Sequence, residues 1–167
     1  MKRIGKYLGL GLLAALVIWQ FIKPERNQSN DNTYGISTKY QVPAEVQSIL
    51  EVACNDCHTN NTEYPWYANV QPVASWINHH VVDGKRHLNL SEFTNRRIAI
   101  QNHKLEEIIE QVKENEMPLP SYTWIHKDAK LTDAQKETLV SWAEGLMNQL
   151  AASYPADSLK MPQRPPR

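Results

Sequence analysis

The chain begins with one long apolar segment. From Ile4 to Ile22, the only interruptions are Lys6 near the start and Gln20 near the end. A helix of these residues would be about 28 Å long at a rise of about 1.5 Å per residue, close to the thickness of the hydrocarbon core of a bilayer. Residues 1–22 are therefore predicted to form a transmembrane signal anchor, and the cations at its start are expected to keep that end in the cytoplasm.

A cleaved signal peptide is the main alternative for this segment. Such a signal needs small residues just before the cleavage site. The segment instead ends in the string WQFIKP, which offers no such site. We therefore favour an anchor that is retained.

Polar stretches flank the part of the chain that is expected to fold. Residues 23–41 are rich in Asn and Ser and are predicted to be a flexible linker, with an end-to-end distance on the order of 25 Å. Residues 151–167 are rich in proline and are predicted to be a disordered tail. The folded domain is therefore expected over residues 42–150.

Within this domain, apolar residues recur at helical spacing rather than in the alternating pattern of strands. Three helices are predicted: one begins at Pro43, one ends before Pro118, and one begins at a capping box that starts at Thr132. Their apolar faces are Val46, Ile49, Leu50 and Ala53; Leu105, Ile108, Ile109 and Val112; and Leu139, Val140, Trp142, Ala143 and Leu146.

The first half of the domain is less regular. A shorter helix is predicted over residues 91–101. Residues 60–90 contain prolines, aromatic residues and polar residues without a helical period, and they are predicted to be loops. The expected fold class is therefore all-α.

Composition and charge exclude two classes of protein. The 167 residues carry 18 Lys and Arg and 18 Asp and Glu, so the basic excess typical of a nucleic-acid-binding protein is absent. Two cysteines are too few for a disulfide-rich scaffold. The charge is uneven, because residues 1–26 have a net charge of +4 and the rest of the chain has −4. An acidic body favours partners with a basic docking patch.

The most informative motif is Cys54-Asn55-Asp56-Cys57-His58. This C-x-x-C-H pattern is the attachment signature of c-type haem. At the end of a helix, residues three apart face the same way, so the two thiols can each reach one vinyl group of the porphyrin. His58 is then placed to ligate the iron from one side. The sequence therefore predicts one covalently bound haem c with its iron, and Asp56 is expected to face solvent.

Three other interpretations of the two cysteines compete with haem attachment. A thioredoxin-like redox pair would follow a strand in a βαβ unit, which the pattern lacks. A zinc site would need a further ligand at matched spacing and usually a second pair of cysteines. A structural disulfide would account for the cysteines but not for the histidine that follows. Haem attachment accounts for all three residues.

A low-spin electron carrier also needs a ligand on the other side of the iron. Met117 is the best candidate, because it follows a predicted helix and precedes a proline-rich loop that would hold its thioether in place. A thioether ligand raises the reduction potential. A methionine beside a helix also commonly fills a core. Among the histidines, His80 is the strongest rival because apolar residues flank it, and His87 is next.

Aromatic residues follow the motif closely. Trp66 and Trp76 are predicted to contact the haem, because aromatic side chains exclude water from a flat apolar ring system. An ordinary core cluster is the alternative. Lys85 or Arg86 could hydrogen-bond the propionates. Nothing in the sequence resembles a catalytic dyad or triad.

Three longer strings carry a resemblance to a known family: CNDCHTNNTEYPWYANVQPVASWINHHVVDGKRHLN, NEMPLPSYTWIHKDAKLT and LVSWAEG. Residues from about 45 to 145 resemble the haem-binding domain family of small, single-haem proteins of bacterial envelopes. The resemblance implies covalent haem at Cys54 and Cys57, with His58 as the proximal ligand. It also implies a cytochrome c-like helical domain in which Met117 and the proline after it take the place of the distal Met-Pro.

Together these features predict a membrane-anchored protein similar to single-haem c-type cytochromes, with its haem domain on the periplasmic side. The expected function is the transfer of single electrons between redox partner proteins of the cell envelope, as a carrier rather than an enzyme. The alternative is a haem-based sensor or peroxidase-like protein with an open sixth coordination position. A third class is a thiol oxidoreductase without haem.

Overall fold

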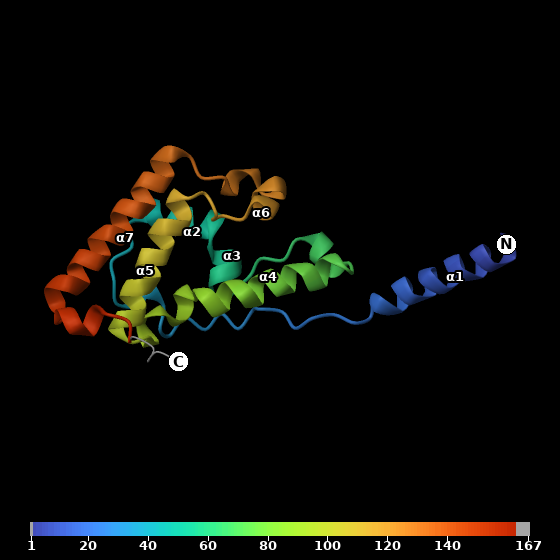
Figure 1. Ribbon diagram of the computed structural model, residues 1–167, viewed down its shortest axis with the longest axis horizontal. Helices are drawn as coiled ribbons and strands as arrows, with labels where there is room; N and C mark the ends of the chain where they lie inside the picture. The colour runs from blue at the N-terminus through green and yellow to red at the C-terminus, as the bar shows by residue number, and fades with distance from the viewer. Residues whose placement is uncertain (1, 163–167) are drawn as a thin grey trace.

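The amphipathic segments of the sequence form helices that share one core (Figure 1). The structure, a computed structural model, describes residues 2–162. Its α-helices are α1 (Lys2–Trp19), α2 (Ala44–Ala53), α3 (Asn55–His58), α4 (Val73–His87), α5 (Ile98–Lys113), α6 (Pro120–Ile125) and α7 (Asp133–Ser153). Short 3₁₀ helices connect them: η1 (Ile36–Thr38), η2 (Trp66–Asn69), η3 (Leu90–Asn95), η4 (Lys127–Ala129) and η5 (Ala156–Leu159). Residues 2–162 contain no strand, so the prediction of an all-α fold is confirmed.

The core lies where α2, α5 and α7 meet. α5 and α7 run side by side, and α2 packs against α7 (Figure 1). Leu105 on α5 and Ala143 on α7 are completely buried, and Leu139 and Leu150 on α7 are nearly so. Burying each such leucine stabilises the fold by about 1.5–3 kcal/mol. The three long helices predicted from the apolar pattern are therefore confirmed.

Two of these helices begin as their sequences predict. Pro43 is the N-cap residue of α2. At the start of α7, the Thr132 hydroxyl oxygen accepts a hydrogen bond from the Gln135 N–H at 3.3 Å. In return, Gln135 Oε1 accepts one from the Thr132 N–H at 2.9 Å. This reciprocal pair is the predicted capping box, and it satisfies two backbone donors that the helix itself leaves free.

The prediction of loops over residues 60–90 is wrong in its second half, where α4 forms. Only Ala74 and Val81 of this helix are buried. Two such positions are too few to mark a helical period in the sequence, which explains the error. Tertiary contacts stabilise α4 instead, because it packs against α3, the short helix of the C-x-x-C-H motif.

The short helix predicted over residues 91–101 is also corrected. The structure has the 3₁₀ helix η3 there, and α5 begins only at Ile98. The side chain of Asn89 starts η3 by accepting a hydrogen bond from the Ser91 N–H at 3.0 Å. Arg96 is extended and separates the two helices.

The tail predicted to be disordered from residue 151 is helical at first. α7 continues to Ser153, η5 follows, and Tyr154 and Leu159 pack against the core. These apolar contacts order a segment whose proline content predicts disorder. The last part of that predicted tail, residues 163–167, lies outside the described residues.

Residues 23–41, predicted to be a flexible linker, lie along the domain instead. Ile36 and Tyr40 are 6% and 4% exposed and belong to the core. The Tyr40 hydroxyl donates a hydrogen bond to Gln101 Oε1 at 2.6 Å. Nearer the start of the segment, the side-chain amide of Asn27 donates to the loop that follows the motif. Polar composition predicts a free coil here, but the polar side chains bind the domain.

α1 projects away from the domain, and the side chains of residues 3–19 are exposed (Figure 1). Among residues 2–162, no helix is both long and apolar enough to cross a membrane. α1 ends at Trp19 and includes the three cations at its start. The prediction of a transmembrane helix in residues 1–22 is not confirmed.

The closest approach between α4 and the motif gives a test of the packing. At Gly84, a Cβ atom would lie 2.7 Å from the carbonyl oxygen of Cys57. We expect Gly84→Ala to destabilise the domain by about 1–3 kcal/mol, because α4 would have to move away from the motif. Urea denaturation followed by circular dichroism measures the change.

Gly145→Ala on α7 is the matched control. A Cβ there meets nothing within 4 Å, and alanine in a helix is about 0.5–1 kcal/mol more favourable than glycine. We therefore expect the control to be neutral or stabilising. Equal effects of the two substitutions would contradict the close contact at Gly84.

Candidate functional site

A single helical turn carries the C-x-x-C-H motif. α2 ends at Ala53, and the chain turns at Cys54 into α3. The N–H groups of Cys57 and His58 both donate to the carbonyl of Cys54, at 3.2 and 3.0 Å. The two thiols and the imidazole are therefore carried by one tight turn. Both cysteines are free thiols.

Burial changes the acidity of the two thiols. Burial raises the pKa of Cys54 from 9.0 to about 12 and that of Cys57 to about 11, and the charge of Asp56 adds to the shift at Cys57. Both thiols are therefore protonated at neutral pH. A thioredoxin-like pair needs the opposite, a thiol whose pKa is lowered toward neutrality. The shifts argue against that interpretation.

The imidazole of His58 is oriented by the end of α4. Its Nδ1 lies 3.0 Å from the carbonyl oxygen of Leu88, the C-cap residue of that helix. A carbonyl only accepts hydrogen bonds, so we assign the proton to Nδ1, which leaves Nε2 with the lone pair that a metal ligand needs. Burial lowers the pKa of His58, and hydrogen bonds to the carbonyls of Leu88 and Gly84 partly oppose this shift. The ring is neutral at pH 7, the form that ligates iron.

These donors fit a covalently attached haem. Two free thiols and a neutral, oriented imidazole on one turn are the groups that C-x-x-C-H attachment uses. Within residues 2–162, no three His, Cys, Asp or Glu side chains are grouped so that they could hold a metal ion. The zinc alternative therefore lacks its further ligands. The free thiols likewise argue against a structural disulfide.

Asp56, which was expected to face solvent, is half-buried and joins the motif to two other segments. Its Oδ2 accepts a hydrogen bond from the Tyr122 hydroxyl on α6 at 2.8 Å. Its Oδ1 accepts one from the Glu63 N–H at 2.9 Å, and its carbonyl oxygen accepts one from the Thr62 hydroxyl at 2.6 Å. The expectation failed because Tyr122 lies far away in the sequence.

A histidine and a second tyrosine extend this contact. The ring of Tyr122 stacks on His126, with centroids 4.3 Å apart, and His126 Nε2 lies 2.9 Å from the hydroxyl of Tyr67. Burial and the hydrogen bond to Asp56 raise the pKa of Tyr122, so its hydroxyl stays protonated and keeps donating. Sequence reasoning missed this group. The sequence gives one sign of this group, because its four members lie in the strings that carry the family resemblance: Asp56, Tyr67, Tyr122 and His126.

Met117 lies between α5 and α6 at a half-buried position. Its N–H donates to the carbonyl of Gln111 at 3.2 Å, and α6 begins three residues later. Because Tyr122 on α6 is bonded to Asp56, the loop that carries Met117 leads into a helix fastened to the motif. Its role as an iron ligand stays a prediction.

The rival histidines both lie on α4. His80 packs edge-on against Trp76, with ring centroids 4.5 Å apart. His87 is exposed at the last residue of α4, directly before Leu88, whose carbonyl bonds to His58. His87 is therefore the rival that the structure brings near the motif.

The residues predicted to contact the haem body and its propionates are mostly exposed. Trp66 on η2 is 78% exposed and Trp76 is 46% exposed, so neither is part of a buried wall. Lys85 donates to Asn27, and Arg86 pairs with Asp83 on its own helix. Contact of these four residues with haem stays a prediction.

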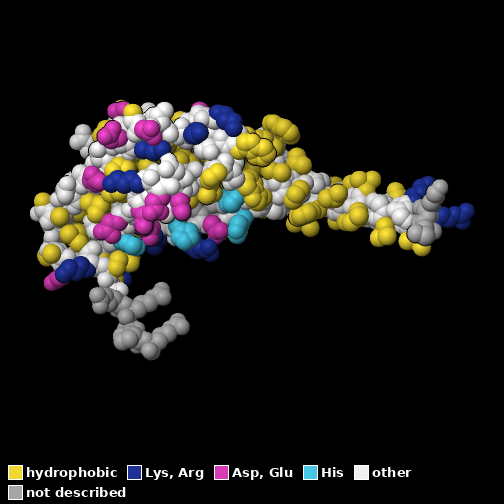
Figure 2. Space-filling view, turned by 45° about the horizontal axis from the view of Figure 1, so that its top comes forward, with side chains coloured by type: hydrophobic (Ala, Val, Ile, Leu, Met, Phe, Trp, Pro, Cys, Tyr) yellow, Lys and Arg dark blue, Asp and Glu magenta, His cyan; other side chains and the backbone are white. Residues whose placement is uncertain are grey.

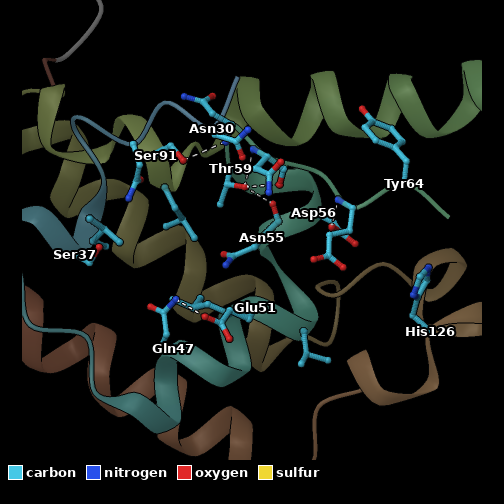
Figure 3. A pocket seen from close by; sticks show the side chains of 18 of the residues that line it. Asn30, Ser37, Gln47, Glu51, Asn55, Asp56, Thr59, Tyr64, Ser91 and His126 are labelled. Carbon is cyan, nitrogen blue, oxygen red and sulfur yellow. Dashed lines mark hydrogen bonds between the residues drawn. The ribbon is translucent and has the colours of Figure 1, made fainter. Parts of the chain in front are cut away.

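A cavity of about 800 Å³ opens beside the motif (Figure 3). Asn55 and Asp56 line it from α3, Glu51 lines it from α2, and His126 lines it from the segment after α6. The two cysteines and His58 do not belong to its lining. The cavity therefore faces the two middle residues of the motif.

The contact between Asp56 and α6 can be tested by removing one hydroxyl. We expect Tyr122→Phe to destabilise the domain by about 1–2 kcal/mol, because Asp56 loses a donor at a half-buried position. The free energy of unfolding in urea measures this. Tyr34→Phe is the matched control, since Tyr34 is exposed and its hydroxyl makes no hydrogen bond within residues 2–162. A loss as large in the control would contradict the proposed contact.

Comparison with known protein families gives one match. Residues 14–145 match the family described as Haem-binding domain. No curated protein matches the chain, and no solved structure matches it. The family match covers well over half of the chain, including the motif, α4 to α6 and part of α7. It confirms the resemblance seen in the sequence. The chain therefore belongs to the haem-binding domain family.

Proposed function

We propose that this protein attaches one haem covalently through Cys54 and Cys57, with His58 as an iron ligand, and that it carries single electrons. Haem binding is the property of its family, and the covalent attachment and the electron transfer are what we propose. The observation that carries the proposal is the tight turn of two free thiols followed by a neutral imidazole whose Nδ1 is bonded to Leu88.

The residues around the motif suit an electron carrier. Bound haem supplies an iron that cycles between Fe(II) and Fe(III). The Leu88 carbonyl fixes the plane of the His58 ring and increases the basicity of its other nitrogen. The pKa values of Cys54, Cys57 and His58 all shift in the direction that burial causes. A site of this kind excludes water and stabilises the less charged form of a redox centre.

We propose Met117 as the second protein ligand of the iron. Support comes from its loop, which leads directly into α6, and from the hydrogen bond that fastens α6 to Asp56 within the motif. His80 and His87 on α4 are the alternative ligands. An open sixth position would instead favour a haem-based sensor or a peroxidase-like protein.

We also propose that the haem domain works on the extracytoplasmic side of a bacterial membrane, with α1 as its membrane contact. The cations at the start of α1 and its exposed apolar side chains support a contact with lipid. The C-x-x-C-H motif supports the location, because c-type haem is attached to exported protein. Redox partners of the envelope would exchange electrons with the part of the chain after residue 26, whose net charge of −4 favours a basic docking patch on the partner.

Covalent attachment is tested by haem staining. The full chain is produced together with a c-type haem maturation system, and the purified protein is run on a denaturing gel. We expect a stained band at 19.2 kDa, because thioether bonds survive denaturation. The double variant Cys54→Ala/Cys57→Ala should lose the stain completely. Asn55→Ala is the matched control, since it changes the motif turn but leaves the C-x-x-C-H signature intact. An unstained wild-type protein, or a stained double variant, would refute the proposal.

The distal ligand is tested by Met117→Ala. We expect the haem to change from six-coordinate low-spin to high-spin, and the reduction potential to fall, because the thioether stabilises Fe(II). Optical spectroscopy and potentiometric titration measure both effects. Met147→Ala is the matched control, because Met147 on α7 packs against the core. An unchanged spectrum in Met117→Ala would exclude this ligand and direct the same test to His80 and His87.

A further inference from the structure

The end of α1 is fastened to the domain by Gln71, which is only 4% exposed. The N–H of Gln71 donates to Gln20 Oε1 at 2.9 Å, and its carbonyl accepts from Gln20 Nε2 at 3.3 Å. Its side-chain Nε2 donates to the carbonyl of Ile22 at 2.6 Å. Its Oε1 accepts from both the N–H and the hydroxyl of Ser75 on α4, at 3.2 and 2.8 Å. One buried residue thus joins the chain just after α1 to the start of α4.

A second contact supports this junction. The guanidinium of Arg26 lies over the ring of Tyr64, 4.8 Å from the centroid, and donates to Asn69 Oδ1 on η2. Two stretches on the N-terminal side, residues 20–22 and Arg26, are therefore held against residues 64–75. The direction of α1 is coupled to the orientation of the domain.

Apolar side chains are exposed at this junction. Phe21 and Ile22 are 84% and 65% exposed, and across the junction Trp66 and Val70 are 78% and 44% exposed. We call these four residues the junction surface. Figure 2 shows hydrophobic side chains that continue from this end of the domain onto α1. Exposed apolar side chains that lie together on a folded protein are typical of an interaction site.

The pattern of charge around this area fits a lipid surface. α1 contains no acidic residue, and its three cations lie at its start. Lys23 and Arg26 follow its other end, with Glu25 between them. Apolar side chains on all sides of a helix need lipid or a protein core around them, whereas a helix that lies in a protein groove has one polar face. Cations that flank apolar side chains bind anionic headgroups, and the indole of Trp66 is suited to the boundary between headgroups and acyl chains.

We propose that the junction surface rests on a bilayer of anionic phospholipid, and that Gln71 holds the haem domain against α1 so that the domain has one orientation on the membrane. The inference deepens the proposed membrane location. It does not depend on the haem chemistry, and the two can fail separately.

Hydrogen exchange tests the contact directly. The full haem-loaded protein is mixed with vesicles of phosphatidylglycerol and phosphatidylethanolamine, and amide exchange is followed by mass spectrometry. We expect residues 64–72 to exchange several-fold more slowly with vesicles than without, while α5 is unchanged. Unchanged exchange in residues 64–72 would overturn the proposal. Protection of the same residues without lipid, rising with protein concentration, would overturn it in favour of a second copy of the chain.

A matched pair of substitutions tests the apolar residues. Val70→Ser combined with Trp66→Ser should weaken binding in vesicle flotation about tenfold, because two apolar contacts with lipid are lost. The control is Val82→Ser, which removes a valine that is 54% exposed on α4 outside the junction surface. The control should bind as the wild type does. An equal loss in both variants would refute the assignment of the surface.

Gln20→Met tests the fastening and keeps the side chain of buried Gln71, which still bonds to Ile22 and Ser75. This variant removes both hydrogen bonds between Gln20 and Gln71. We expect vesicle binding within about twofold of the wild type, since α1 is intact, but loss of the protection at residues 64–72. Retained protection would refute the role of the Gln20 side chain in holding the domain against α1. Haem content is measured on every sample, so a protein without covalent haem that still shows the protection would refute only the proposed function.

Discussion

The packing of α4 against the motif turn is the constraint on which the candidate site depends. Gly84 allows the two backbones to approach closely at Cys57. Leu88, the extended C-cap residue of α4, donates its N–H to the carbonyl of Gly84, and its own carbonyl lies 3.0 Å from Nδ1 of His58. The close approach and the hydrogen bond are therefore coupled. The residue that ends α4 thus supplies the carbonyl from which we assign the proton to Nδ1 of His58.

The motif turn is too short to hold its own shape. α3 has four residues, and isolated helices of that length are unstable in water. Its geometry is imposed from two sides, by α4 through Gly84 and Leu88, and by α6 through the hydrogen bond of Tyr122 to Asp56. A middle residue of the motif thus acts as a structural link, while the cysteines and the histidine remain available for their chemistry.

Local patterns made much of the fold predictable. α2, α5 and α7 were identified because their buried residues repeat every three or four positions, and the capping box at Thr132 marked a helix start. The motif was identifiable because its chemistry depends on spacing within five residues. α4 was not predicted, because only Ala74 and Val81 are buried and two positions do not mark a helical period. The hydrogen bond between Asp56 and Tyr122 joins residues 66 positions apart, and no local pattern signals such a pair.

The ordered course of residues 27–41 changes where the folding unit begins. Composition places its start at residue 42, yet Ile36 and Tyr40 are part of the core. A fragment trimmed at residue 42 to remove the apolar N-terminus would leave an empty space there. It would also leave Gln101, only 1% exposed, with an acceptor that has lost its partner, at a cost of about 1–3 kcal/mol. Trimming that also spares the contacts of buried Gln71 has to end before Gln20, whose side chain bonds to the backbone of Gln71.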